Sequence, residues 1–195
     1  MSQPQVLSLL ERTLREPAIK LGFNRIQVAI PINELKIDDV RELKIRALNA
    51  LKYAIQSDGK IPNAYDVTQI LRIEGIDIPD DWSFTISNTG WSEVLSATVP
   101  QDTYLVIYGL AILDSEERVE RVRILNGTNI LADIYVHTAY VDNSVPPELY
   151  LTMPIVYTPN DVIKLQVYAI TTGDTRIMLR GYMATSAGKV LSSGS

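Results

Sequence analysis

Apolar and polar residues alternate with a period of two along much of the second half of the chain. In residues 162–170 apolar side chains occupy every second position, and residues 130–137 and 175–184 repeat this pattern. A period of two is typical of a β-strand with one face in a core and the other face outside it. Residues 103–111 are instead almost continuously apolar. This run predicts a central strand that is covered on both faces.

Turn residues separate these segments at intervals of roughly 8–12 residues. Asn126-Gly127 is a strong hairpin signal, because both central positions of a type I′ turn need a positive φ. Pro154 interrupts another segment, so we expect an edge strand or a bulge there. About eight strands result, at residues 83–87, 91–99, 103–111, 119–125, 130–137, 148–157, 162–170 and 175–184. They predict a mainly β protein that folds as an antiparallel, jelly-roll-like β-sandwich. Periodicity alone does not distinguish a sandwich from a barrel.

The first 82 residues predict an N-terminal helical arm or subdomain with about three helices. Residues 3–15 predict a short amphipathic helix, because Leu9, Leu10 and Leu14 fall at helical spacing. A helix this short needs a surface to dock on, so we take these three leucines as interface candidates. We therefore divide the chain into an arm (residues 1–82), a β-sandwich domain (residues 83–184) and a flexible tail (residues 185–195).

The rest of the arm predicts one short strand and two further helices. Residues 25–30 alternate and predict a strand or an extended segment. Asp38 or Asp39 can cap the second helix, and Gly59 suits the position just past its end. Its apolar stripe comprises Val40, Leu43, Ala47, Leu48, Leu51, Ala54 and Ile55. Residues 62–72 predict the third helix, which opens on Pro62-Asn63.

Composition and charge narrow the classes of function. The 195 residues include no cysteine, which excludes a disulfide scaffold and fits synthesis in a reducing cytosol. The first ten residues do not resemble a signal peptide, and no stretch reaches the about 18 apolar residues of a membrane helix. The net charge is −5 and the Lys and Arg residues are dispersed. We therefore expect neither a nucleic-acid partner nor a membrane.

Residues that could carry catalysis are scarce. His137 is the only histidine, and its place on the polar side of a strand favours a surface or interface residue over a general base. Asp77, Asp80 and Asp81 could bind Ca²⁺, but they lack EF-hand spacing and a solvated loop explains them better. No phosphate-binding glycine motif is present. We therefore expect no enzyme, no cofactor and no metal.

Tyrosine is the unusual feature of the composition. The chain has ten tyrosines and two phenylalanines, and eight of the tyrosines fall after residue 100. Tyrosine is enriched at protein interfaces, but it can equally cap the rims of a sandwich, and both interpretations remain open. The residues that we predict to lie in an interface, besides the three leucines, are Tyr135, His137, Tyr168 and Tyr182. A row of tyrosines could also stack on sugars.

Three segments of the β region resemble small β-sandwich proteins of tailed bacteriophage particles. They are VPQDTYLVIYGLAI (Val99–Ile112), PPELYLTMPIVYTPNDVIKLQVYA (Pro146–Ala169) and RGYMA (Arg180–Ala184). The resemblance covers residues 83–184, and capsid decoration or cement proteins are the nearest kind. It implies a virion protein that binds the outside of the shell, often as a homotrimer, with the major capsid protein as its partner. The alternative is a receptor- or carbohydrate-binding module of a phage tail or fibre, with a stacking platform near Trp91 and Tyr135.

Overall fold

The computed structural model describes residues 27, 29–31, 34–70, 82–114, 116–136 and 148–186. The helix is α2 (Ile37–Ser57), followed by the short 3-10 turn η2 (Pro62–Ala64). The strands are β1 (Ala29–Pro31), β2 (Tyr65–Gln69), β3 (Ser83–Ile86), β4 (Gly90–Thr98), β5 (Thr103–Ile112), β6 (Val119–Asn126), β7 (Asn129–Tyr135), β8 (Glu148–Tyr157), β9 (Val162–Ala169) and β10 (Gly173–Ser186).

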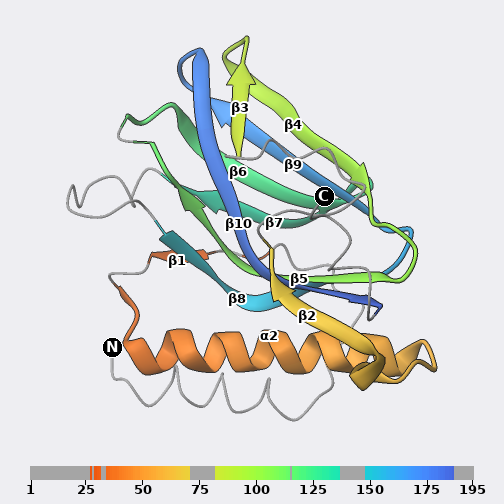
Figure 1. Ribbon diagram of the computed structural model, residues 1–195. Helices are drawn as coiled ribbons and strands as arrows, with labels where there is room; N and C mark the ends of the chain where they lie inside the picture. Colours follow the sequence, from red (N-terminus) through yellow and green to blue (C-terminus); the bar gives the residue numbers. More distant parts are fainter. Residues whose placement is uncertain are drawn as a thin grey trace, which may run out of the picture.

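The strands form two antiparallel sheets that pack face to face (Figure 1). One sheet has the order β1-β8-β5-β10-β2, and β3 pairs with the first half of β10. The other sheet has the order β4-β9-β6-β7. The prediction of a mainly β, antiparallel fold is confirmed. The eight strands expected after residue 83 are β3 to β10.

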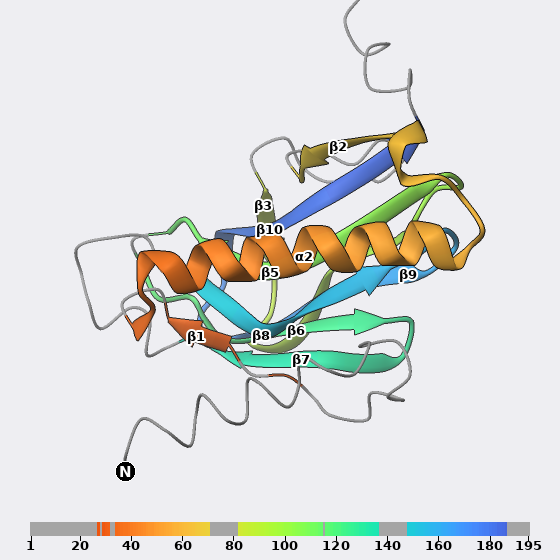
Figure 2. The ribbon, with the colours of Figure 1, turned by 90° about the horizontal axis from the view of Figure 1, so that it is seen from below.

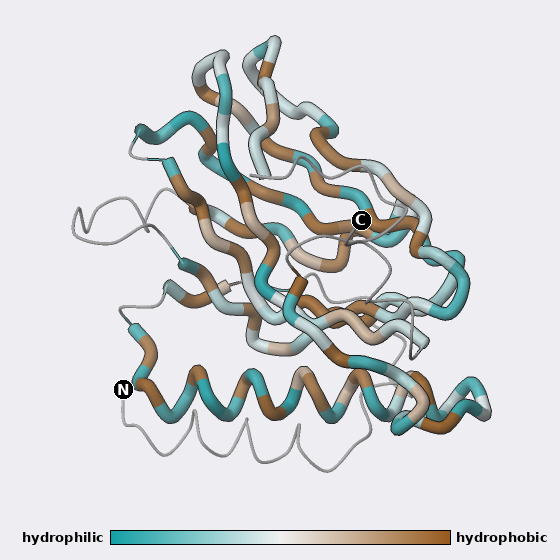
Figure 3. Tube along the Cα trace, viewed as in Figure 1, coloured by the Kyte–Doolittle hydropathy of each residue, from teal (hydrophilic) through white to brown (hydrophobic). Residues whose placement is uncertain are grey.

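A continuous apolar core fills the space between the sheets. Leu105 and Ile107 of β5 face Ile124 of β6 and Leu165 of β9, and all four are fully buried. Polar and apolar residues alternate along the strands of the four-stranded sheet (Figure 3). The period-two pattern thus places one set of side chains in this core and leaves the other set on the outer face.

Helix α2 covers the outer face of the larger sheet, so the molecule has three layers (Figure 2). Leu43, Ala47 and Leu51 of α2 are buried against β5 and β8. This second core explains why every residue of β5 is buried, as its continuously apolar sequence predicts. Asp39 accepts a hydrogen bond from the Lys36 N–H at 2.9 Å and so caps the helix from its third position. Gly59 follows the helix with a φ of +71°, as expected.

The predicted third helix is wrong. After η2, residues 65–69 form β2, which pairs with the end of β10. The prediction relied on Pro62 as a helix start and on three- or four-residue spacing of the apolar residues that follow. The same residues also alternate, with Tyr65 and Val67 on the side of α2. The hydrogen bonds that β10 offers to its neighbour favour the strand over a helix of about three turns.

The N-terminal part of the described chain joins both sheets. β1 pairs with β8, and Gln27 bridges to Ala132 of β7, so this segment links the edges of the two sheets. The Gln27 side chain also accepts a hydrogen bond from the Met153 N–H at 3.1 Å. The division of the chain at residue 82 stays a prediction. β1 and β2, which precede this residue, lie in the same sheet as β5, β8 and β10, which follow it. Residues 3–15 lie outside the described residues.

Strand β8 carries the irregularity that Pro154 predicts. Its pairing with β5 stops at Tyr150 and resumes at Ile155, while β5 moves on by only two residues. The extra residues form a bulge around the proline, which cannot donate a hydrogen bond to the ladder. The prediction of an edge strand or a bulge is confirmed as a bulge.

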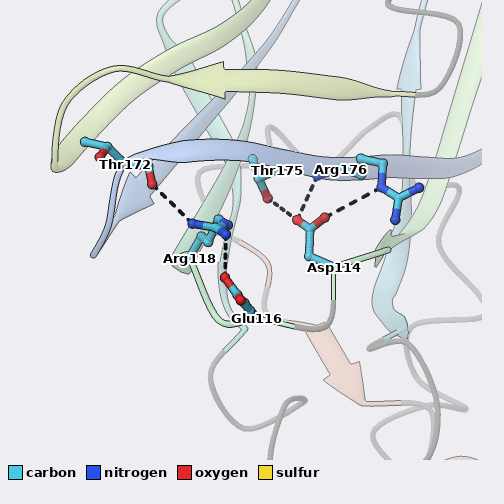
Figure 4. A network of polar contacts seen from close by, with 6 residues as sticks. All are labelled: Asp114, Glu116, Arg118, Thr172, Thr175 and Arg176. Carbon is cyan, nitrogen blue, oxygen red and sulfur yellow. Dashed lines mark hydrogen bonds and ion pairs between the residues drawn. The ribbon is translucent and has the colours of Figure 1, made fainter.

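Polar contacts tie the loop between β5 and β6 to the start of β10 (Figure 4). Asp114 accepts hydrogen bonds from the Thr175 hydroxyl at 2.6 Å and from the Arg176 N–H at 2.8 Å. Arg118 donates to the carbonyl oxygen of Thr172 at 3.2 Å. These polar groups serve as hydrogen-bond partners for one another, so we assign the cluster the structural role of holding the β5–β6 loop against β10.

Candidate functional site

The outward side chains of the four-stranded sheet form two rows across its strands. The first row is Trp91 of β4, Tyr168 of β9, Arg121 of β6 and Tyr135 of β7. The second row is Glu93, Gln166, Arg123 and Asp133 on the same four strands. Side chains directly opposite one another in a sheet are close enough to interact. We call these eight residues the Trp91 face.

The indole ring of Trp91 is held by three neighbours. The Arg123 guanidinium carbon lies 3.7 Å from the ring centroid, and that of Arg121 lies at 5.7 Å. The Tyr168 ring meets it edge to face, at 5.5 Å between centroids. Cation–π and edge-to-face contacts of this kind each contribute about 0.5–1.5 kcal/mol. The exposed aromatic ring is therefore already ordered before anything binds to it.

Asp133 positions both arginines. Its carboxylate accepts hydrogen bonds from Nε and Nη2 of Arg121 at 3.1 and 2.7 Å, and from Nε of Arg123 at 2.9 Å. The Asp133 side chain is only 11% exposed, so this network is partly shielded from water. At the other side of the face, Lys164 pairs with Glu93 at 3.0 Å. The Trp91 face thus carries aromatic and guanidinium groups that are held by one another and by Asp133.

The predicted interface residues do not form one group. Tyr135 and Tyr168 lie in the first row of the Trp91 face, whereas Tyr182 packs beneath α2 with its ring 5.5 Å from that of Tyr108. Leu9, Leu10, Leu14 and His137 lie outside the described residues, as do Asp77, Asp80 and Asp81. Whether any of these residues contacts a partner stays a prediction.

Most of the described tyrosines pack in or against the two cores. Tyr104, Tyr108 and Tyr150 are buried between α2 and the sheet, and burial raises the pKa of Tyr108 to about 12. Burial also raises the pKa of Tyr104 to about 12, and the hydrogen bond that its hydroxyl donates to Asp58 at 2.7 Å adds to the shift. Tyr157 lies in the core between the sheets and donates to the Leu125 carbonyl oxygen at 2.8 Å. The tyrosine-rich composition thus reflects mainly the middle layer of the molecule.

Two hollows lie between α2 and the larger sheet, on the side of β2. One has a volume of about 370 Å³ and is mainly apolar, with Leu48, Leu51, Ile55, Pro62, Tyr65 and Val67 in its lining. The other has a volume of about 190 Å³ and is polar, with Lys44, Gln69, Glu148 and Arg180 in its lining. The described residues include no group of three or more His, Cys, Asp or Glu side chains that could hold a metal ion. None of the helices described is long and apolar enough to cross a membrane.

Arg121, Arg123 and Asp133 belong to the site but were not among the residues predicted from the sequence. The alternation of Arg121, Val122 and Arg123 places both arginines on one face of their strand, and that signal is visible in the sequence. Their position beside Trp91 depends on β9 lying between β4 and β6. Strand order of this kind is not encoded in any local pattern.

No family model matches this chain, and no curated protein matches it. One similar solved chain comes from a structure of infectious bursal disease virus, Gx strain, with 18% identity and a TM-score of 0.32. That match covers 67% of this chain and 35% of the other. A second, described as a pentameric capsid protein isolated from metagenomic phage sequences, has 13% identity and a TM-score of 0.25, and covers 96% and 95% of the two chains. Neither likeness carries an argument about the fold or the function of this protein.

Proposed function

We propose that this protein is a non-enzymatic structural protein of a virus particle, which binds the outside of a capsid shell and stabilises it as a cement or decoration protein. The observation that carries the proposal is the Trp91 face, which presents tryptophan, tyrosine and arginine on the outer face of the four-stranded sheet. These three residue types are enriched at the centres of protein interfaces. The resemblance of residues 83–184 to phage particle proteins directs the proposal toward a capsid.

Ordered side chains make this face suited to binding a rigid shell. Binding usually costs free energy because interface side chains lose rotamer freedom. Here Asp133 and the arginines already hold the Trp91 ring, so less freedom remains to be lost. A protein that binds only assembled shells shifts the equilibrium toward assembly by mass action. In this proposal the partner is the major capsid protein, and the decoration protein acts as a homo-oligomer such as a trimer.

Co-sedimentation with purified particles of the virus that encodes the chain tests the proposal. The wild-type protein should pellet with intact shells. Trp91→Ala should weaken binding by about 2 kcal/mol, or about 30-fold, as expected for a central tryptophan. Tyr53→Ala is the matched control, because Tyr53 is an aromatic residue of similar exposure (44% against 38%) on α2, across the molecule. A wild-type protein that stays in the supernatant would refute the proposal.

A carbohydrate- or receptor-binding module of a tail or fibre is the second candidate. It is favoured by two exposed aromatic rings, Trp91 and Tyr135, on one face of the four-stranded sheet. They stand three strand steps apart, about 14 Å, so they would contact different sugar units. The Arg123 guanidinium group already lies over the Trp91 ring, at 3.7 Å from its centroid, on the face that it covers. Binding of the wild type, and not of Trp91→Ala, to a glycan array in the absence of shells would favour this function.

A further inference from the structure

Strand β2 forms one end of its sheet in the described part of the chain, where another strand could be added. It stands at the end of its sheet, and no other described strand pairs with its outer side. The Ile70 N–H donates to Gly181 of β10, and the register continues with Thr68 opposite Met183. In an antiparallel pair every second residue directs its N–H and C=O away from the partner. Tyr65, Val67 and Gln69 therefore direct these groups outward.

An apolar hollow lies beside this edge. It has a volume of about 370 Å³, between Leu48 and Ile55 of α2 and Tyr65 and Val67 of β2. Val67 is 42% exposed, and the nearby Ile61 is more exposed still. A strand that joins the edge would cover these side chains and place its own apolar residues in the hollow. The edge and the hollow together favour an extended segment with an apolar residue at every second position.

We propose that the occupant is residues 19–23 of a second copy of this chain. The segment reads Ile19-Lys20-Leu21-Gly22-Phe23, with apolar residues at every second position and the same length as β2. With Leu21 opposite Val67, all three apolar residues lie on the side of α2. Lys20 then lies on the opposite face, where Asp66 of β2 carries the complementary charge.

The reach of the chain requires a second copy. Phe23 is four residues before Gln27, so the two lie at most about 14 Å apart. Gln27 leads into β1, which stands four strand steps from β2, or about 19 Å. Figure 2 shows β1 and β2 on opposite sides of α2. The segment therefore cannot reach the free edge of its own subunit, but it can reach that of a neighbour.

Self-association of this kind goes beyond the proposed binding to a shell and does not depend on it. The donor segment and the acceptor edge are different surfaces, so each subunit both gives and receives a strand. Such a head-to-tail contact builds a closed ring or a longer assembly. Its failure would leave the Trp91 face untouched, and a loss of shell binding would leave the assembly intact.

Light scattering of the purified full-length chain and two variants tests the inference. The wild type should have a mass that is a multiple of 21.8 kDa. Leu21→Asp disables the donor segment, and Val67→Pro removes an outward N–H from the acceptor edge of β2. Each variant should therefore have the mass of a single chain. Val67→Ala keeps the N–H and should stay associated. Val67→Lys replaces the proline variant if thermal melting shows that the proline prevents folding.

Mixing the two variants gives the decisive result. The donor variant keeps an intact edge and the acceptor variant keeps an intact segment, so a mixture should form a 1:1 complex although neither associates alone. Because the chain has no cysteine, Leu21→Cys in one copy and Val67→Cys in the other should also form a disulfide between chains. A monomeric wild type, an associated Leu21→Asp variant, or a mixture that stays monomeric would overturn the inference.

Discussion

Replacing Asp133 by alanine should destabilise the protein much more than replacing Glu93, although both are acids of the Trp91 face. Asp133 accepts three hydrogen bonds from two arginines and is 11% exposed. Glu93 makes one ion pair with Lys164 and is 38% exposed. The comparison therefore varies the environment of a carboxylate while the sheet and the face stay the same.

The geometry sets the size of both effects. Losing hydrogen bonds between charged groups costs about 1.5–3 kcal/mol, and the partial exposure of Arg121 and Arg123 places Asp133→Ala near about 2 kcal/mol. An exposed ion pair is worth at most about 0.5–1 kcal/mol, so Glu93→Ala should cost about 0.5 kcal/mol. For a chain of this length each kcal/mol lowers the Tm by about 2–4 °C. We expect Tm losses of about 4–8 °C for Asp133→Ala and about 1–2 °C for Glu93→Ala.

Thermal denaturation and tryptophan fluorescence measure the two consequences separately. Salt at about 1 M should remove the effect of Glu93→Ala but leave most of that of Asp133→Ala, because shielded pairs are screened less. Acrylamide should quench Trp91 more strongly in Asp133→Ala, since Arg123 no longer holds the ring, while the buried Trp82 serves as an internal reference. Equal Tm losses in the two variants, or unchanged quenching, would refute the role of Asp133 as a positioning residue.

Two further predictions concern glycine substitutions and the titration of buried tyrosines. Gly181→Ala should lower the free energy of unfolding by about 3 kcal/mol, because the added Cβ would overlap the carbonyl oxygen of Val106. Gly127→Ala has free space for the Cβ and should lower it by only about 1–2 kcal/mol, because of the φ of +59° at this position. Urea denaturation of the two variants measures the difference. The raised pKa values of Tyr104 and Tyr108, about 12 each, mean that the unfolded chain loses these protons first, near pH 10. Stability that is fully present below pH 10 should therefore fall between pH 10 and 12, as Tm and tyrosinate absorbance would show; a Tm that stays constant across this window would contradict it.

Much of the architecture was predictable because it rests on local periodicity. Alternation, the apolar run of residues 103–111 and the turn residues between segments identified the eight strands from β3 to β10, and three- and four-residue spacing identified α2. The unbroken apolar run of β5 required a cover on each face of that strand. These signals are readable because burial acts on each side chain through its own position in a strand or a helix.

The site was only partly predictable. Trp91, Tyr135 and Tyr168 were candidates from their residue type, but Tyr182 belongs to the layer beneath α2. Nothing local distinguishes an outward tyrosine on a strand covered by a helix from one on a strand left uncovered. That distinction depends on which sheet α2 packs against.

By itself, the sequence determined the strands, the helix and the sides on which their apolar residues lie, because each depends on residues a few positions apart. Tertiary structure decided which strands are neighbours and in which register, since these depend on hydrogen bonds between distant residues. Pairing with β10 made residues 65–69 a strand where the sequence alone favoured a helix. The order β4-β9-β6-β7 likewise brought Trp91 and Arg123, more than thirty residues apart in sequence, into one face.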